Sequence, residues 1–172
     1  MYRLNRLFAW LSRIRHCRGF GIQSPTDYWF VRYVVNEHWP YYAYEELGLD
    51  DGWLHRKLGQ LYFRLVNWRQ PQSIIDRVGV GDYLHAGCRR ASVVNDVSDY
   101  DLAIVSLKEN YHELFDHAVD GSVIVFQDIA AHKDLWRSIM ADKRATICFD
   151  LYYCGIVVFD SHRTKQSYVV NF

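Results

Sequence analysis

The residues best placed for chemistry follow the segment Ser73 to Val78, which reads as a short buried strand after the loop Gln70-Pro71-Gln72. Gly79-Val80-Gly81 comes next. A glycine turn after a strand is where nucleotide-binding folds pass their backbone beneath the ligand. Only 19 residues, 82 to 100, separate this turn from the next clear strand. Because a strand–helix–strand unit takes about 30 residues, the sequence predicts a shortened nucleotide-binding core.

Asp128 is a second candidate, because it follows the continuous apolar segment Ser122 to Phe126. Such a segment is typical of a strand buried on both faces of a parallel sheet. Ligands of these sheets bind outside the carboxyl ends of the strands, so Asp128 is the candidate catalytic carboxylate. Its alternative role is to cap the helix expected after it, since Asp is a favoured N-cap residue.

Histidine and cysteine offer weaker signals. His112 and Asp116 lie four apart on one expected helix and could hold a metal with a third ligand. The sequence identifies no third ligand, so solvated helix faces are the simpler interpretation and no metal is expected. The four cysteines form no CxxC pair and suit buried apolar positions in a reducing cytoplasm: Cys17, Cys88, Cys148 and Cys154.

Residues 2–18 have the pattern of an arginine-rich amphipathic helix, with Leu7, Leu11 and Ile14 on its apolar side. Such a helix could lie on an anionic membrane or grip a nucleic acid backbone. The alternative is that it docks on its own domain or on a second copy. The chain has no net charge, so nucleic acid is not the expected partner. No apolar run reaches the 18 or so residues of a membrane span.

The elements that must position these residues indicate an α/β, Rossmann-like fold. At 172 residues the chain fits one domain, with a helical section at 1–70 packed on a core at 71–172. The first section carries a net charge of +4 and the second −4. We expect a mostly parallel sheet of about five to six strands. An antiparallel C-terminal hairpin is expected between 155–159 and 166–171.

Several segments resemble a bacterial group of class I S-adenosylmethionine (SAM)-dependent methyltransferase-like proteins, of the O-methyltransferase-like type. The resemblance lies in Gly21-Ile22-Gln23-Ser24-Pro25 and in Pro40-Tyr41-Tyr42-Ala43-Tyr44-Glu45. It continues in 121–129 and 150–159, which look like later strands of that family. It covers most of 20–70 and 101–172 and is weakest across 76–100.

The resemblance implies roles for four residues in binding SAM. Asp76 would be the acid after the first strand, Gly79 and Gly81 would let the backbone approach the cofactor, and Asp96 would hydrogen-bond the ribose. The chain departs from the family pattern at Tyr83, which stands where a third glycine is expected and would collide with the ligand. After the strand at 101–105, Ser106-Leu107 stands where the family carries an Asp-Gly-like pair near the substrate.

Three functional interpretations fit these residues. The first is a methyltransferase-like protein with an eroded cofactor site, acting without catalysis as a binding or assembly module and forming a homodimer. The second is a compact SAM-dependent methyltransferase with a rebuilt site, in which Asp128 is the base. The third is docking to a membrane or nucleic acid through residues 2–18. Under the first interpretation no cofactor is bound, and under the second the cofactor is SAM.

Overall fold

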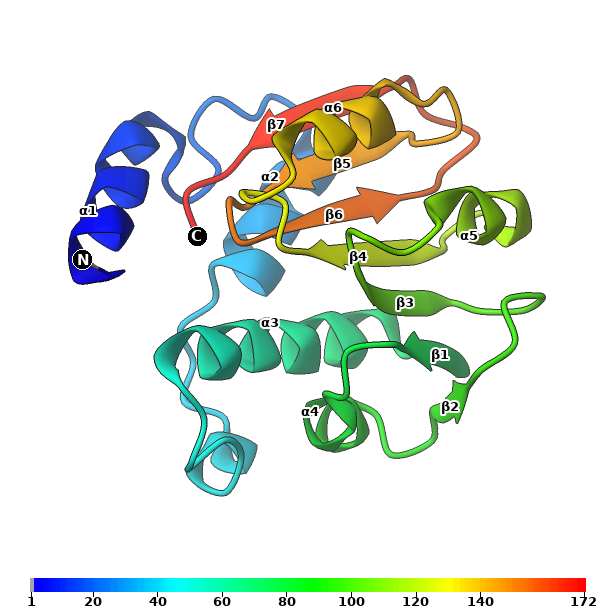
Figure 1. Cartoon of the computed structure of the whole chain (residues 1–172), viewed down its shortest axis with the longest axis horizontal. Coiled ribbons are helices and arrows are strands. Elements are labelled where there is room, and N and C mark those ends of the chain that lie inside the picture. The colour runs from blue at the N-terminus through cyan, green and yellow to red at the C-terminus, as the bar shows by residue number, and fades with distance from the viewer. Residues whose placement is uncertain (1) are drawn as a thin grey trace.

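A computed structural model describes residues 2–172, with side chains from Leu7 onward (Figure 1). The helical segments are α1 (Tyr2–Ser12), η1 (Ile14–His16), α2 (Pro25–Phe30), η2 (Val31–Val35), η3 (Tyr42–Glu45), α3 (Trp53–Arg69), α4 (Gly81–Gly87), α5 (Tyr111–His117) and α6 (Lys133–Ala141). The strands are β1 (Ser73–Asp76), β2 (Ser92–Val94), β3 (Leu102–Ser106), β4 (Val123–Gln127), β5 (Ile147–Asp150), β6 (Cys154–Val158) and β7 (Gln166–Val169). The α/β class is confirmed.

One sheet contains all seven strands, in the order β2-β1-β3-β4-β6-β5-β7. β1 pairs in parallel with β2 and β3, and β3 pairs in parallel with β4. β6 runs the other way and is antiparallel to both of its neighbours, β4 and β5. The mostly parallel, Rossmann-like sheet is therefore as predicted, although seven strands exceed the expected five to six.

Different strands form the C-terminal hairpin from those expected. The predicted pairing of 155–159 with 166–171 is wrong, because β6 pairs with β5, from Ile147↔Val158 to Asp150↔Gly155. With β4 on its other side, β6 has no free edge left for a further strand. β7 therefore crosses back and lies parallel to β5 at the sheet edge.

Helices cover both faces of the sheet. Successive side chains of a strand point to opposite faces, and β1 illustrates this alternation. Ile74 belongs to a buried cluster with Leu61 of α3, whereas Ile75 belongs to a second cluster with Leu114 of α5 and Trp136 of α6. Burial on both faces explains why β3 and β4 are continuous apolar runs rather than alternating ones.

The N-terminal section is attached to the last strands. Arg13 donates to the carbonyl oxygen of Asp150 at 2.8 Å and to its Oδ1 at 2.7 Å. The backbone N–H of Asn171 donates to the carbonyl of His16 at 3.0 Å. In Figure 1, α1 accordingly lies beside the C-terminus of the chain.

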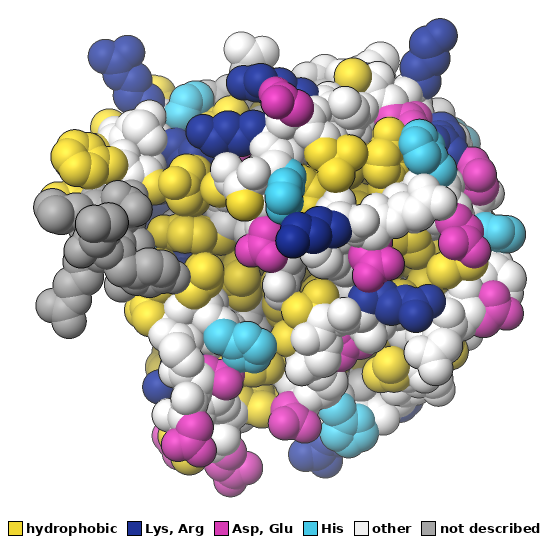
Figure 2. Space-filling view, viewed as in Figure 1, with side chains coloured by type: hydrophobic (Ala, Val, Ile, Leu, Met, Phe, Trp, Pro, Cys, Tyr) yellow, Lys and Arg dark blue, Asp and Glu magenta, His cyan; other side chains and the backbone are white. Residues whose placement is uncertain are grey.

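The arginine-rich segment is helical over most of its length, but the helix expected over 2–18 ends at Ser12 and is followed by the short segment η1. Its apolar side is largely uncovered. Leu7, Phe8, Leu11 and Ile14 are each about half exposed or more. Basic and acidic side chains both occur across the face shown in Figure 2, so the opposite net charges of the two sections do not give that face a single sign. None of the helices within residues 2–172 is long and apolar enough to cross a membrane.

Candidate functional site

Polar residues end three neighbouring parallel strands: Asp76 ends β1, Ser106 ends β3 and Gln127 ends β4. β2 lies on one side of β1 and β3 on the other, so the strand order reverses between β1 and β3. In open α/β sheets the ligand crevice lies outside the carboxyl ends of the strands at such a reversal. We call residues 76–81, 106–107 and 127–128 the carboxyl-edge site.

Asp76 closes the turn that follows β1. Its Oδ1 accepts hydrogen bonds from the N–H groups of Val78 at 3.0 Å and Gly79 at 2.8 Å. Its Oδ2 accepts from the N–H of Val80 at 2.8 Å. Gly79 has a φ of +80°, in the left-handed region that glycine adopts without strain. Three backbone donors that a ligand could use are therefore bonded to the protein's own carboxylate.

The two glycines of the turn leave open space beside the backbone. Nothing lies within 4 Å of the point that a Cβ on Gly79 would occupy. At Gly81 the nearest atom is Oδ2 of Asp76, at 3.9 Å. Gly81 also begins α4, a helix of seven residues that the sequence pattern did not predict.

Tyr83 does not lie over this turn. Its ring packs against α3 so closely that a Cβ on Gly59 would stand 2.4 Å from it. Its hydroxyl donates to Oδ2 of Asp51 at 2.7 Å. Burial, together with this bond, raises the pKa of Tyr83. The expected collision between this ring and a ligand is wrong, because α4 directs the side chain into the space that Gly59 provides.

Asp96 is fully exposed in a turn after β2. Its Oδ1 accepts from the N–H of Ser98 at 3.0 Å, and this bond lowers the pKa of Asp96. Arg77 donates to the carbonyl of Asn95 at 2.9 Å, so its side chain bridges the segments that follow β1 and β2. Asp76, Asp96 and Asp128 do not form one cluster that could hold a metal ion, since the described residues contain no such group of three.

Asp128 is exposed at the end of β4, with a left-handed φ of +64°. Its N–H donates to the carbonyl of Tyr153 at 3.0 Å, and its carbonyl accepts from the N–H of Ala131 at 3.1 Å. The N-cap position of α6 is His132. The alternative role of Asp128 as the cap of this helix is therefore wrong, because a further turn separates them.

A hydrogen-bonded pair that the sequence did not predict joins the carboxyl-edge site to α3. Gln127 donates through Nε2 to the hydroxyl oxygen of Tyr62, a residue of α3, at 2.7 Å. Burial raises the pKa of Tyr62, and the charges of Asp128 and Asp76 add to this shift. No local sequence signal marks the pair, since 65 residues separate its members.

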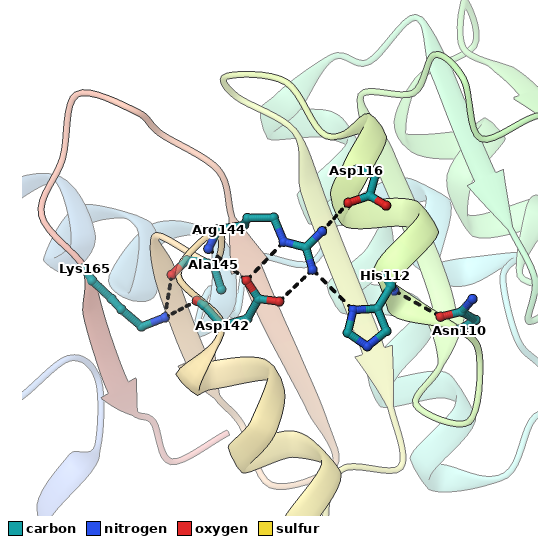
Figure 3. A network of polar contacts seen from close by, with 7 residues as sticks. All are labelled: Asn110, His112, Asp116, Asp142, Arg144, Ala145 and Lys165. Atoms are coloured by element: carbon teal, nitrogen blue, oxygen red, sulfur yellow. Dashed lines mark hydrogen bonds and ion pairs between the residues drawn. The ribbon is translucent and has the colours of Figure 1, made fainter.

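The histidine–carboxylate pair of α5 is held by an arginine (Figure 3). Arg144 forms ion pairs with Asp116 and, at 2.7 Å, with Asp142. Its Nη2 also lies 3.3 Å from Nδ1 of His112. The guanidinium of Arg144 therefore lies beside His112 and Asp116, the two candidate metal ligands. Within the described residues, no group of three or more His, Cys, Asp or Glu side chains could hold a metal ion.

Cavities are further places where a ligand could bind, and four of them, of about 220 to 410 Å³, are lined by none of the five predicted site residues.

No protein-family model, curated protein or solved structure matches this chain. The function must therefore be argued from the carboxyl-edge site and from the rest of the structure.

Proposed function

We propose that this chain is a methyltransferase-like binding or assembly module that acts without catalysis and does not use SAM. The observation that carries the proposal is the turn after β1. The N–H groups of Val78, Gly79 and Val80 are all bonded to Asp76. A nucleotide-binding turn acts by presenting such donors to its ligand, and this turn has them directed inward.

The segments after β1 and β2 support the same proposal. In dinucleotide-binding folds, an acid about 20 residues beyond the glycine turn holds the ribose. Here Asp96 binds its own turn, and Arg77 bridges to Asn95. The chain then passes from β2 to β3 with no intervening helix, so the sheet ends at β2. An adenosine group would have neither an acid to bind its ribose nor a strand beyond β2 to enclose it.

A compact SAM-dependent methyltransferase is the second candidate, and one observation favours it. Asp76 ends β1 and Asp128 follows β4, and both strands belong to the same parallel run, so the two carboxylates share the carboxyl edge of the sheet. The glycines of the turn also have open space beside them. In this alternative Asp128 would be the base and Asp76 would bind the cofactor.

Self-association through α1 is the assembly that we infer. The exposed apolar side chains of Leu7, Phe8 and Leu11 lie together on this helix, and patches of this kind mark interaction sites. The arginine-rich segment contributes less free charge than its sequence suggests, because Arg13 is paired with Asp150. Sedimentation equilibrium of the full chain should give a dimer, and a Phe8→Gln, Leu11→Gln variant a monomer. A monomeric wild-type chain would contradict this inference.

A reducing, cytoplasmic location fits the cysteines. All four are free thiols, and three of them are buried. Burial raises the pKa of Cys148 to about 11 and also raises that of Cys154. Such thiols stay protonated and unreactive near neutral pH.

Calorimetry with SAM and with its demethylated product tests the proposal. We expect no heat of binding at ligand concentrations up to about 1 mM, because the turn donors are already bonded. Micromolar binding that is lost in an Asp76→Asn variant would overturn the proposal in favour of the methyltransferase. An Asp134→Asn variant is the matched control, since this carboxylate is 96% exposed on α6.

A further inference from the structure

A cavity of about 410 Å³ lies between the part of α3 from Trp53 to Arg64, residues 35–40, Tyr44 and Phe172. We call it the α3 cavity. Its volume is within the range of small-molecule sites. The side chains that matter for its chemistry are Asn36, Trp39, Trp53, Arg56, Lys57 and Arg64. It shares no lining residue with the carboxyl-edge site, so a ligand of this cavity is independent of the proposed function.

Arg64 brings a buried positive charge to this cavity. It is only 6% exposed, and its three hydrogen bonds go to uncharged oxygens. They reach the carbonyls of Val34 at 2.7 Å and Val35 at 2.9 Å, and the hydroxyl of Tyr44 at 3.3 Å. No ion pair among residues 2–172 includes Arg64. A buried charge without a partner of opposite sign is costly, and a bound anion would supply that partner.

Asn36 supplies an unused hydrogen-bond donor. The residue is 7% exposed, and its Nδ2 has no hydrogen-bond partner in the described structure. Buried donors are nearly always bonded, and Asn36 lines the cavity, so a rotation of its side chain would bring this closed-off donor to an acceptor inside the cavity. The acceptor oxygen and the missing negative charge can belong to the same group.

The remaining charged groups of the lining make the cavity positive. Arg56 and Lys57 join Arg64, and Glu37 is the one Asp or Glu side chain in the lining. Glu37 is already bonded to the hydroxyl of Tyr41, at 2.7 Å. The positive charges near the cavity also act on His38. Burial lowers the pKa of His38, and the charges of Arg18, Arg64 and Lys57 lower it further.

Aromatic rings form the rest of the wall. The ammonium group of Lys57 lies 4.3 Å from the centre of the Phe172 ring and 5.3 Å from that of Trp53. Trp39 is 72% exposed at the same cavity. Flat apolar surfaces beside cations suit a ligand that joins a planar ring to a negative group.

We propose that the α3 cavity binds a small molecule in which a phosphate or carboxylate is attached to a planar ring. The oxyanion accepts hydrogen bonds from the amide of Asn36 and from the arginines of α3, Arg56 and Arg64. The ring lies against Trp39 and Trp53. Oxyanion and ring are both needed, because the lining combines hydrogen-bond donors with aromatic side chains.

Titration of the full chain, followed by two-dimensional NMR, tests this site. Phenyl phosphate and benzoate are the probes, with inorganic phosphate and phenol as single-feature comparisons. At least one of the two ring-bearing anions should shift the side-chain amide of Asn36 and the indole N–H of Trp53 with saturation. It should bind at least tenfold more tightly than inorganic phosphate or phenol. The stronger of the two probes identifies phosphate or carboxylate as the preferred group.

Substitutions localise the effect. Arg56→Gln should weaken binding about tenfold, because a charge-assisted hydrogen bond is lost, and Lys57→Gln provides a second variant if the first does not fold. Arg90→Gln is the matched control, since this arginine is exposed after α4 and outside the cavity. Arg64 is left intact because it also holds the carbonyls of Val34 and Val35.

The proposal fails if neither ring-bearing anion shifts Asn36 or Trp53 at 10 mM. It also fails if Arg90→Gln weakens binding as much as Arg56→Gln. The SAM experiment concerns Asp76 and the glycine turn, so failure of the proposed function and failure of this inference are distinguishable.

Discussion

Asp27 shows how single residues tie distant parts of this chain together. Its carboxylate is 2% exposed and lies near the start of α2. Arg163 donates to Oδ1 at 2.7 Å and to Oδ2 at 2.6 Å, and Tyr168 donates to Oδ2 at 2.8 Å. Burial alone raises the pKa of Asp27, but these donors outweigh burial, so the pKa is lowered below its usual value. One carboxylate thus joins the N-terminal section to the segment around β7.

Replacing Arg163 by Met should lower the free energy of unfolding by about 3–5 kcal/mol, because it leaves a buried carboxylate without its cation. Denaturant unfolding measures this loss. Arg137→Met is the control, since its pair with Asp134 is 70% and 96% exposed. That variant should change stability by no more than about 1 kcal/mol. Equal effects of the two substitutions would contradict the structural role given to Arg163.

At the scale of elements, the packing of α4 on α3 explains why the turn after β1 keeps its shape. α4 has only seven residues, and its N-cap, Val80, makes no side-chain hydrogen bond. A helix this short has little stability of its own. The ring of Tyr83, buried against Gly59, fixes it to α3. The same contact holds Gly81 at the end of the turn.

Gly59→Ala should lower the free energy of unfolding by about 1–3 kcal/mol through overpacking, although Ala is favoured over Gly in a helix by about 1 kcal/mol. The added Cβ would stand 2.4 Å from the Tyr83 ring. In a Tyr83→Leu background the penalty should largely disappear, which a double-mutant cycle measures. Gly52→Ala, with nothing within 4 Å of its Cβ position, is the control without overpacking. Because Gly52 is the N-cap of α3, it should lose only the N-cap preference of Gly over Ala, and Tyr83→Leu should not change that loss. A Gly59→Ala chain as stable as wild type would refute the close contact.

At the scale of the whole molecule, segments with strong local patterns were predictable and long-range arrangements were not. The apolar runs around Leu102 and Val123 gave β3 and β4, and Ser24-Pro25 gave the start of α2. α4 was missed because its position depends on Gly59, far away in sequence. The strand predicted to pair with β7 was wrong, because the pairing depends on which strand edges remain free in the folded sheet.

The candidate site was predictable only in part. Its first acid and its glycines follow from the strand and the turn, and the structure has them at the carboxyl end of β1. The sequence does not show that Asp76 accepts hydrogen bonds from its own turn, or that Asp96 accepts one from a different turn. Both facts depend on the geometry of the backbone. The α3 cavity has no sequence signature, because the burial of Arg64 depends on carbonyls about 30 residues earlier in the chain.

Stability of the whole chain should decrease as the pH falls below about 5. The pKa of Asp27, Asp120 and Asp142 is lowered in the folded state. A carboxyl with a lowered folded pKa stabilises the protein above its unfolded pKa of about 3.9, and this stability is lost as the pH falls through the folded value.

Chemical denaturation from pH 7 to pH 2 measures this dependence. Asp27→Asn should remove the part of the pH dependence of the unfolding free energy that comes from Asp27, and it should lower stability at neutral pH. Asp134→Asn should keep the wild-type profile, since this side chain is 96% exposed. An unchanged profile in Asp27→Asn would contradict the assignment.

The reversed strand β6 sets an order of events during synthesis on the ribosome. It stands between β4 and β5 in the finished sheet, yet it is translated after both. Until its residues emerge, the edge of β4 has no neighbour, and nascent chains with unpaired edges are prone to aggregate. The contact of Arg13 with Val170 comes later still, because Val170 follows β7. The N-terminal helix, although translated before the whole sheet, is therefore among the last elements to reach its final position.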